Sequence, residues 1–242
     1  ALQIQSNHIQ MSYYFMFVIL FFVGAYFEDA YRKKELPHFF KASGVLALAA
    51  VVGVCINISN LYHTYEYSKE TMRGKSELKQ EGAAASQTSS GLDRDYITNW
   101  SYGIGETLTL LVPNVKGGGS GSTMSQSEAA MAKANPMYNG IYSQLPQYFG
   151  EQPWTAGPVY VGAFVMFLFV LGCFIVKGPL KWALLGATIF SILLSWGKNF
   201  MGLTDFFIDY VPMYNKFRAV SSILVIAEFT IPLLAIFALK EI

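Results

Sequence analysis

Long apolar windows constrain the fold of this 242-residue chain more than any other feature of its sequence. A helix needs about 20 apolar residues to cross the hydrocarbon core of a bilayer, where it satisfies its own backbone hydrogen bonds. Windows with no charge, or with one acidic interruption, cover residues 9–27, 42–60, 156–176, 182–197 and 219–239. They predict an all-α polytopic membrane protein with about five transmembrane helices.

The composition also indicates a membrane protein. Hydrophobic residues make up 53% of the chain and charged residues 14%, which is typical of integral membrane proteins. The 17 Lys and Arg residues nearly balance the 16 Asp and Glu residues, so we expect membrane lipids and no nucleic acid as partners. Because residues 9–27 lack the basic start and cleavage site of a signal peptide, we also expect the remaining spans of a longer parent chain.

Short loops that carry Lys and Arg indicate the cytoplasmic side, here residues 28–41 and 177–181. Alternation of the spans then predicts three extracytoplasmic segments: residues 1–10, 61–155 and 198–218. The chain is expected to divide into an outer-face start with two spans, an extracytoplasmic cap, and three spans with an interfacial helix, at residues 1–60, 61–155 and 156–242.

The outer segments carry further local signals. Residues 61–81 predict a helix that continues the second span, and the apolar run that ends at Pro113 is strand-like. The Gly/Ser-rich residues 117–125 predict a flexible loop. Residues 201–211 predict an interfacial helix that stops before Pro212.

Asn7, His8 and Gln10 stand at the outer start of the first span. The free backbone amides of a helix N-terminus favour anions such as phosphate or carboxylate. These side chains therefore predict a site for a polar ligand. The alternative is that they cap the helix and form hydrogen bonds with interfacial water.

Glu106 and Trp100 are the candidate functional residues of the cap. A carboxylate near aromatic side chains can bind a sugar or act as a base, so Glu106 is the catalytic candidate within this chain. The alternative is a structural role in which Glu106 accepts hydrogen bonds from neighbouring backbone. Trp100 can form a platform for a sugar or pack against the cap.

Three cationic residues, Lys198, Lys216 and Arg218, gather at the outer ends of the last two spans, near Asp205 and Asp209. Arg presents a rigid fork that suits phosphate, so this cluster can hold a lipid phosphate or diphosphate head group. The alternative is anchoring at the membrane interface together with local ion pairs.

Glu228 interrupts the last apolar window one turn before Pro232. Acidic residues inside a bilayer usually face a bundle interior or a water-filled cavity. Glu228 therefore marks a proton or substrate path, or it is a buried structural partner for a cation or hydroxyl. Asn57, near the outer end of the second span, fits the same internal polar network. The sequence contains no metal-ligand spacing and no nucleotide-binding motif, so no metal site is predicted from the residues.

Four stretches, in this order, resemble the YfhO family of bacterial membrane proteins, and the similarity covers essentially the whole chain. They are NHIQMSYYF at 7–15, YEYSKETMRG at 65–74, WSYGIGETLTLLVPN at 100–114 and MYNKFRAVSSILVIAEF at 213–229. Members of the family are longer, so the resemblance implies an internal fragment of a protein of the bacterial inner membrane.

The family is similar to the GT-C class of glycosyltransferases, which pass a sugar from a polyprenyl-phosphate carrier to an acceptor on the outer face. The resemblance implies such a carrier as a partner and allows a divalent metal as a cofactor. It implies phosphate contacts at Lys198 and Arg218, and cavity contacts at Asn7, His8, Trp100 and Glu106. The catalytic acidic residue of the class follows the first span, which implies a position upstream of Ala1.

Three functions therefore remain open. The leading hypothesis is part of a glycosyltransferase-like protein of the cell envelope. The second is a transporter or flippase of a lipid-linked envelope precursor, which Glu228 and the neighbouring Pro232 suggest. The third is a non-catalytic membrane scaffold that uses residues 61–155 as its docking surface.

Overall fold

The computed structural model describes residues 1–74 and 91–242, which are mostly helical and include no β-strand. The α-helices are α1 (Leu2–Gln5), α2 (Ile9–Lys33), α3 (Leu36–Cys55), α4 (Ile58–Lys69), α5 (Arg94–Thr98), α6 (Glu128–Met131), α7 (Asn139–Tyr142), α8 (Ala163–Ile175), α9 (Pro179–Ser195), α10 (Met201–Tyr210) and α11 (Val225–Glu241). Short 3-10 helices are η1 (Gly105–Leu110), η2 (Met124–Gln126), η3 (Pro136–Tyr138), η4 (Gly197–Phe200), η5 (Tyr214–Lys216) and η6 (Val220–Leu224). The predicted helical fold class is confirmed at this level.

Among the described residues, three helical segments are long and apolar enough to cross a membrane: Ile9–Lys33, Leu36–Cys55 and Val220–Glu241. α9 reaches that length only together with η4 and α10, from which it is bent by 107°. α8 has 13 residues, because positive φ at Gly162 delays the start of the helix to Ala163. Three of the five expected spans are thus confirmed by length and composition, and the other two windows form shorter helices.

The core lies where α11 packs between α8 and α9 and where α9 packs on α2. The buried hydroxyls of Thr188 on α9 and Thr230 on α11 lie 2.7 Å apart and form a hydrogen bond, in which either oxygen can be the donor. A Cβ atom at Gly172 would lie 3.0 Å from the carbonyl oxygen of Leu234, so α8 and α11 approach closely there. Small residues and hydroxyl pairs at helix contacts are the usual means of helix association in membranes.

α3 differs from the other long helices because none of its residues is buried. It packs on α2 near the turn that joins them, where Phe27 contacts Phe39 and Phe40. The exposed side chains in the second half of α3 include the aliphatic residues Val45, Leu46, Leu48 and Val51. A long uncovered apolar helix of this kind suits a lipid environment and identifies the chain as a membrane protein.

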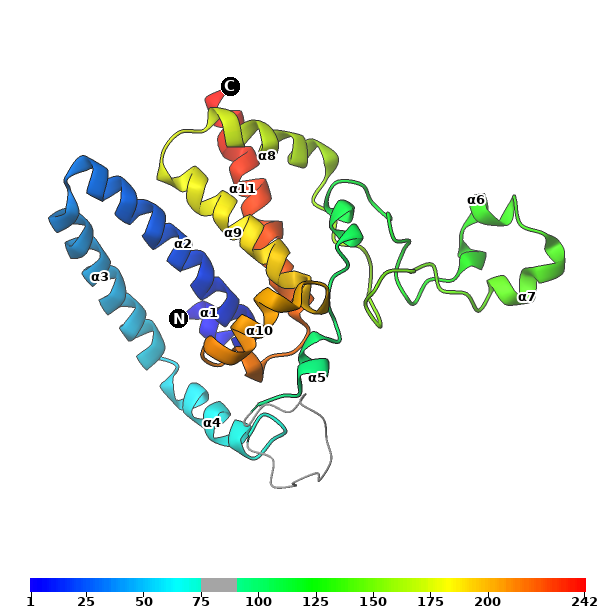
Figure 1. Ribbon diagram of the computed structural model, residues 1–242, viewed down its shortest axis with the longest axis horizontal. Helices are drawn as coiled ribbons and strands as arrows, with labels where there is room; N and C mark the ends of the chain where they lie inside the picture. Colours follow the sequence, from blue (N-terminus) through cyan, green and yellow to red (C-terminus); the bar gives the residue numbers. More distant parts are fainter. Residues whose placement is uncertain (75–90) are drawn as a thin grey trace.

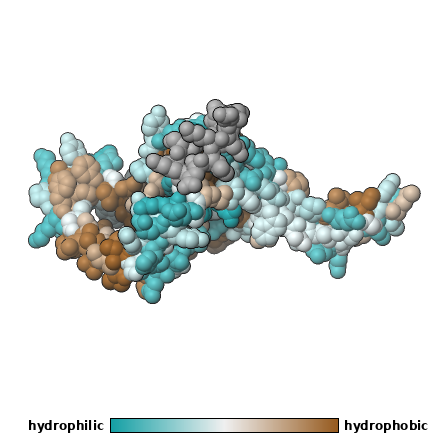
Figure 2. Space-filling view, turned by 90° about the horizontal axis from the view of Figure 1, so that it is seen from below, coloured by the Kyte–Doolittle hydropathy of each residue, from teal (hydrophilic) through white to brown (hydrophobic). Residues whose placement is uncertain are grey.

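The loops divide between two ends of the molecule. Figure 1 shows the α2–α3 turn, the α8–α9 loop and the C-terminus at one end, and α1, α4, α5 and α10 at the other. Figure 2 looks onto this second end and shows hydrophilic residues over its centre, with hydrophobic residues towards the α2–α3 hairpin. The division agrees with alternation across a membrane. The assignment of either end to the cytoplasm stays a prediction.

Two predictions for the outer segments are confirmed and one is wrong. A helix follows the second span, although α4 ends at Lys69 and the predicted residues 75–81 lie outside the described residues. α10 occupies the position of the predicted interfacial helix and ends before Pro212. The strand-like run before Pro113 is instead the 3-10 helix η1, because local turns around Glu106 satisfy its backbone.

Residues 117–125, which the sequence predicts to be a flexible loop, make backbone hydrogen bonds to the returning chain. They form the neck of an arm that carries α6 and α7 away from the helical body (Figure 1). The backbone amide of Gln147 donates to the carbonyl of Ser122 at 2.7 Å, and that of Phe149 donates to the carbonyl of Lys116 at 3.0 Å. Gly117 has φ +81°, and a Cβ atom there would overlap the carbonyl oxygen of Gln147.

The neck gives a first prediction. Gly117→Ala should lower the free energy of unfolding by about 1 kcal/mol or more, because the left-handed backbone and the close carbonyl both oppose a side chain. Gly121→Ala is the matched control, since a Cβ atom there meets nothing within 4 Å. Thermal unfolding and proteolysis of the arm measure the effect. Equal stability of the two variants would contradict a packed neck.

Candidate functional site

An open cavity of about 570 Å³ lies between the start of α2, α4 and the segment around η5. It belongs to the end of the molecule that carries α1, α4, α5 and α10, called the polar end below (Figure 1). Its wall combines amide, imidazole and cationic groups with aromatic and aliphatic side chains. The polar lining residues include Asn7, His8, Gln10, Arg73 and Lys216, and the apolar ones include Leu61, Met213 and Phe217. Ligand sites commonly join an apolar wall to a few polar groups in this way.

The sequence-predicted residues Asn7, His8 and Gln10 all line this cavity. His8 stands at the N-cap position of α2, but its side chain makes no capping hydrogen bond. Asn7 has φ +59° and accepts a hydrogen bond from the amide of Asn60 at 3.1 Å. Gln10 donates to the hydroxyl of Tyr14 at 2.9 Å and to the carbonyl of Arg218 at 2.6 Å. These bonds fix two of the three side chains at the mouth of the cavity.

Arg73 and Lys216 hold the other side of the cavity together. The Nε of Arg73 donates to the carbonyl oxygen of Lys216 at 2.9 Å, and the Nζ of Lys216 donates to the carbonyl oxygen of Arg73 at 2.6 Å. This reciprocal pair joins the end of α4 to η5. Burial lowers the pKa of the Lys216 ammonium.

Arg218 lies next to the cavity but turns its side chain towards another surface. Its guanidinium stacks on the rings of Tyr96 and Trp100, at 5.6 and 5.9 Å from their centroids. Its Nη1 donates to the hydroxyl of Tyr96 at 2.7 Å. The indole Nε1 of Trp100 donates to the carbonyl of Trp154 at 3.2 Å, which is the packing against the cap that the sequence left open.

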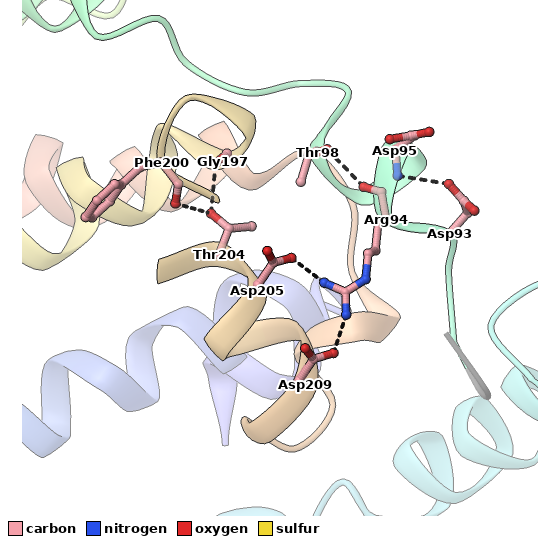
Figure 3. Close-up of polar contacts among 9 residues, drawn as sticks. All are labelled: Asp93, Arg94, Asp95, Thr98, Gly197, Phe200, Thr204, Asp205 and Asp209. Atoms are coloured by element: carbon pink, nitrogen blue, oxygen red, sulfur yellow. Dashed lines mark hydrogen bonds and ion pairs between the residues drawn. The ribbon is translucent and has the colours of Figure 1, made fainter. Parts of the chain in front are cut away.

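Asp205 and Asp209 do not pair with the cations that the sequence placed near them. Both carboxylates, one turn apart on α10, accept hydrogen bonds from the guanidinium of Arg94 at the start of α5 (Figure 3). The bond from Arg94 Nη2 to Asp209 is 2.5 Å long. Asp93 caps α5 by accepting a bond from the amide of Asp95. The fork of Arg94 therefore fixes α5 against α10.

Lys198 has contacts of its own, apart from those of Lys216 and Arg218. Its Nζ lies 3.4 Å from the carbonyl oxygen of Glu151, and its backbone amide donates to the hydroxyl of Ser101 at 2.8 Å. The three predicted cations Lys198, Lys216 and Arg218 thus have separate partners and do not form one cluster.

Glu106 is buried, and its carboxylate accepts hydrogen bonds that hold neighbouring segments together. Its carboxylate accepts bonds from the backbone amide of Gly103 at 2.7 Å and from the hydroxyl of Tyr148 at 2.5 Å. Burial and then the bond to Glu106 raise the pKa of Tyr148 above its ordinary value, so this phenol stays a donor at neutral pH. The backbone amide of Glu151 is a longer contact at 3.4 Å. Glu106 therefore ties η1 to the base of the arm.

Glu228 and Asn57, which the sequence analysis assigned to one internal polar network, share no hydrogen bond in the described part of the chain. Glu228 lies exposed in the first turn of α11, without an ion-pair or hydrogen-bond partner in this part of the chain. Asn57 is buried between α3 and α4, where its amide donates to the carbonyls of Gly53 and Ala1 at 3.0 and 3.3 Å. Within residues 1–74 and 91–242, no group of three His, Cys, Asp or Glu side chains can hold a metal ion.

Sequence reasoning missed Arg73, Arg94 and Tyr148. Arg94 stands between Asp93 and Asp95, which favours local pairing, whereas its partners lie more than one hundred residues away. Arg73 directly follows a polar helix and gave no periodic signal. The one available indication was that Arg73 and Lys216 both lie within stretches quoted for the family resemblance, 65–74 and 213–229.

The Arg94 fork gives a second prediction. Arg94→Gln should lower the free energy of unfolding by about 1–2 kcal/mol, because it removes two charged bonds and leaves two like charges one turn apart on α10. Lys69→Gln is the control, since it removes an exposed ion pair with Glu66 and an exposed contact with the ring of Tyr65, and should change stability by less than about 0.5 kcal/mol. Thermal unfolding measures both. Equal losses would argue against the fork as an anchor.

A third prediction separates the two roles of Glu106. Glu106→Gln should destabilise the fold by about 1–3 kcal/mol, because an amide offers one acceptor oxygen where Gly103 and Tyr148 both donate. Glu151→Gln, an exposed carboxylate in the same region, should have little effect. Unfolding temperature and sugar transfer are measured together. A Glu106→Gln protein of unchanged stability that has lost transfer would instead support catalysis by this carboxylate.

No protein-family model matches the sequence, and no curated protein or solved structure matches it. The resemblance to the YfhO family therefore stays a prediction from the sequence.

Proposed function

We propose that this chain is part of a membrane-embedded glycosyltransferase-like protein that acts on a polyprenyl-phosphate-linked sugar at the outer face of the bacterial inner membrane. One observation carries the proposal. The cavity at the polar end unites Asn7, His8 and Gln10, the polar residues that the sequence singled out, with an apolar wall. A lipid-linked sugar presents the same combination of a polar head group and an apolar chain.

The roles follow from the geometry of the cavity. Asn7 and Gln10 are held by hydrogen bonds and offer amide groups to sugar hydroxyls. His8 is exposed at the cavity, and no hydrogen bond of its imidazole occurs in the described part of the chain. In the proposed reaction an acceptor hydroxyl attacks the anomeric carbon, and its proton passes to the departing phosphate oxygen. The bond to the phosphate oxygen breaks, and polyprenyl phosphate leaves.

The role of Glu106 in this proposal is positional. Its buried carboxylate already accepts two strong bonds, and the space around it holds about 10 Å³, which is too small for a sugar. Trp100 and Lys198 likewise contact the cap and not the cavity. The substrate therefore meets the residues at the start of α2 and the end of α4.

The test is mass spectrometry of envelope glycans and lipid carriers in cells that lack the full-length protein. Complementation with His8→Ala or Asn7→Ala should leave a sugar missing from an envelope polymer and the charged carrier accumulated. Gln5→Ala, an exposed amide outside the cavity, should restore the wild-type profile. An unchanged glycan profile in cells without the protein would refute sugar transfer.

A second candidate is a transporter or flippase of a lipid-linked envelope precursor, which the 107° bend between α9 and α10 favours. Broken helices near a substrate site are a feature of secondary transporters. The two functions differ in one measurement. A transporter moves the carrier across vesicles reconstituted with the full-length protein and forms no glycosidic bond, whereas the transferase forms the bond when the carrier is already on the outer side.

A further inference from the structure

Two cations face the cavity from segments that are far apart in the sequence. Arg73 follows α4 and Lys216 ends η5, and both line the same wall. Each side chain donates to the carbonyl oxygen of the other residue. These bonds bring two positive charges together and hold them in place.

The pair lacks a carboxylate partner in the described part of the chain. The ion pairs found there involve Arg32, Lys33, Lys69 and Arg94, and none involves Arg73 or Lys216. The contrast with Arg94 is direct, because Arg94 has a carboxylate on each side of its fork. Both cavity cations are also half-buried, so water screens their mutual repulsion only in part.

The unused donors suit an anion with several oxygens. The Nη1 and Nη2 groups of Arg73 make no hydrogen bond or ion pair within residues 1–74 and 91–242, and the ammonium of Lys216 has donors beyond the one used. A guanidinium fork beside an ammonium matches the geometry and charge of phosphate. The apolar side chains of Leu61, Met213 and Phe217 line the same cavity, which suits a chain attached to that phosphate.

We propose that Arg73 and Lys216 bind the phosphate of an amphiphilic phosphate ester, with its chain against Leu61, Met213 and Phe217. Naming this substrate class rests on the proposed function. The assignment moves the phosphate contact from Lys198 and Arg218, whose side chains are engaged elsewhere, to a pair of residues that the sequence did not connect.

The test measures binding and does not require catalysis. Full-length protein in maltoside micelles, which contain no phosphate, is titrated calorimetrically with farnesyl phosphate and with farnesol as its uncharged match. Farnesyl phosphate should bind more tightly, and added salt should weaken it and leave farnesol unaffected. Competition by inorganic phosphate would show that the anion alone is recognised. If inorganic phosphate does not compete and farnesyl phosphate still binds more tightly than farnesol, the attached chain is required.

Variants locate the contact. Lys216→Gln and Arg73→Gln should each weaken farnesyl phosphate by about tenfold or more, with farnesol unchanged. Lys69→Gln, a cation at the same end that is paired with Glu66 and lies outside the cavity lining, should bind as the wild type does. If the Gln variants fail to fold, the salt dependence of the wild-type protein still decides the question.

Three results would overturn the assignment: equal binding of farnesyl phosphate and farnesol, no salt dependence, or full affinity in a folded Lys216→Gln protein. A different result would refute the proposed function. Retained, charge-dependent binding without any change of envelope glycans would refute sugar transfer and leave the phosphate site in place.

Discussion

The packing of α11 between α8 and α9 is the interaction on which the rest of this structure depends. It supplies most of the buried apolar surface around Leu184, Ile231 and Leu234, and it includes the buried Thr188–Thr230 hydroxyl pair. In lipid, association of helices depends on close packing and on polar pairs of this kind. The helical body therefore provides a fixed base from which the polar end is built.

The polar end is assembled through a few charged or hydrogen-bonded anchors. The chain bends after α9 and returns as α10, whose Asp205 and Asp209 hold Arg94 and with it α5. From α5 the chain continues to η1, where Glu106 fixes the base of the arm through Tyr148. Gln10 reaches the carbonyl of Arg218 and so links the start of α2 to the segment before η6. Side chains that resemble catalytic groups in the sequence are used here to connect segments.

The apolar pattern predicted the helical class and the positions of the long helices, because hydrophobic length is a local property of the sequence. It also identified Asn7, His8 and Gln10, since polar residues at the start of a span are visible without a structure. The lengths of α8 and α9 were less accessible, because Gly162 and the bend at Gly197 depend on backbone conformation. The bond from the backbone amide of Gly103 to Glu106 is the local kind that the sequence analysis allowed. The partners of Arg94 and Lys216, and the bond from Tyr148 to Glu106, were not predictable, because each joins segments that are distant in the sequence.

The exposed helix α3 is connected to one wall of the cavity. α3 runs almost directly into α4, with Asn57 buried at the junction, and Leu61, Thr64 and Tyr65 of α4 form one wall of the cavity. The tilt of a lipid-facing helix adjusts to the thickness of the bilayer around it. A change of membrane thickness that reorients α3 is therefore transmitted to that wall, and the width of the cavity becomes a property shared by the protein and its membrane.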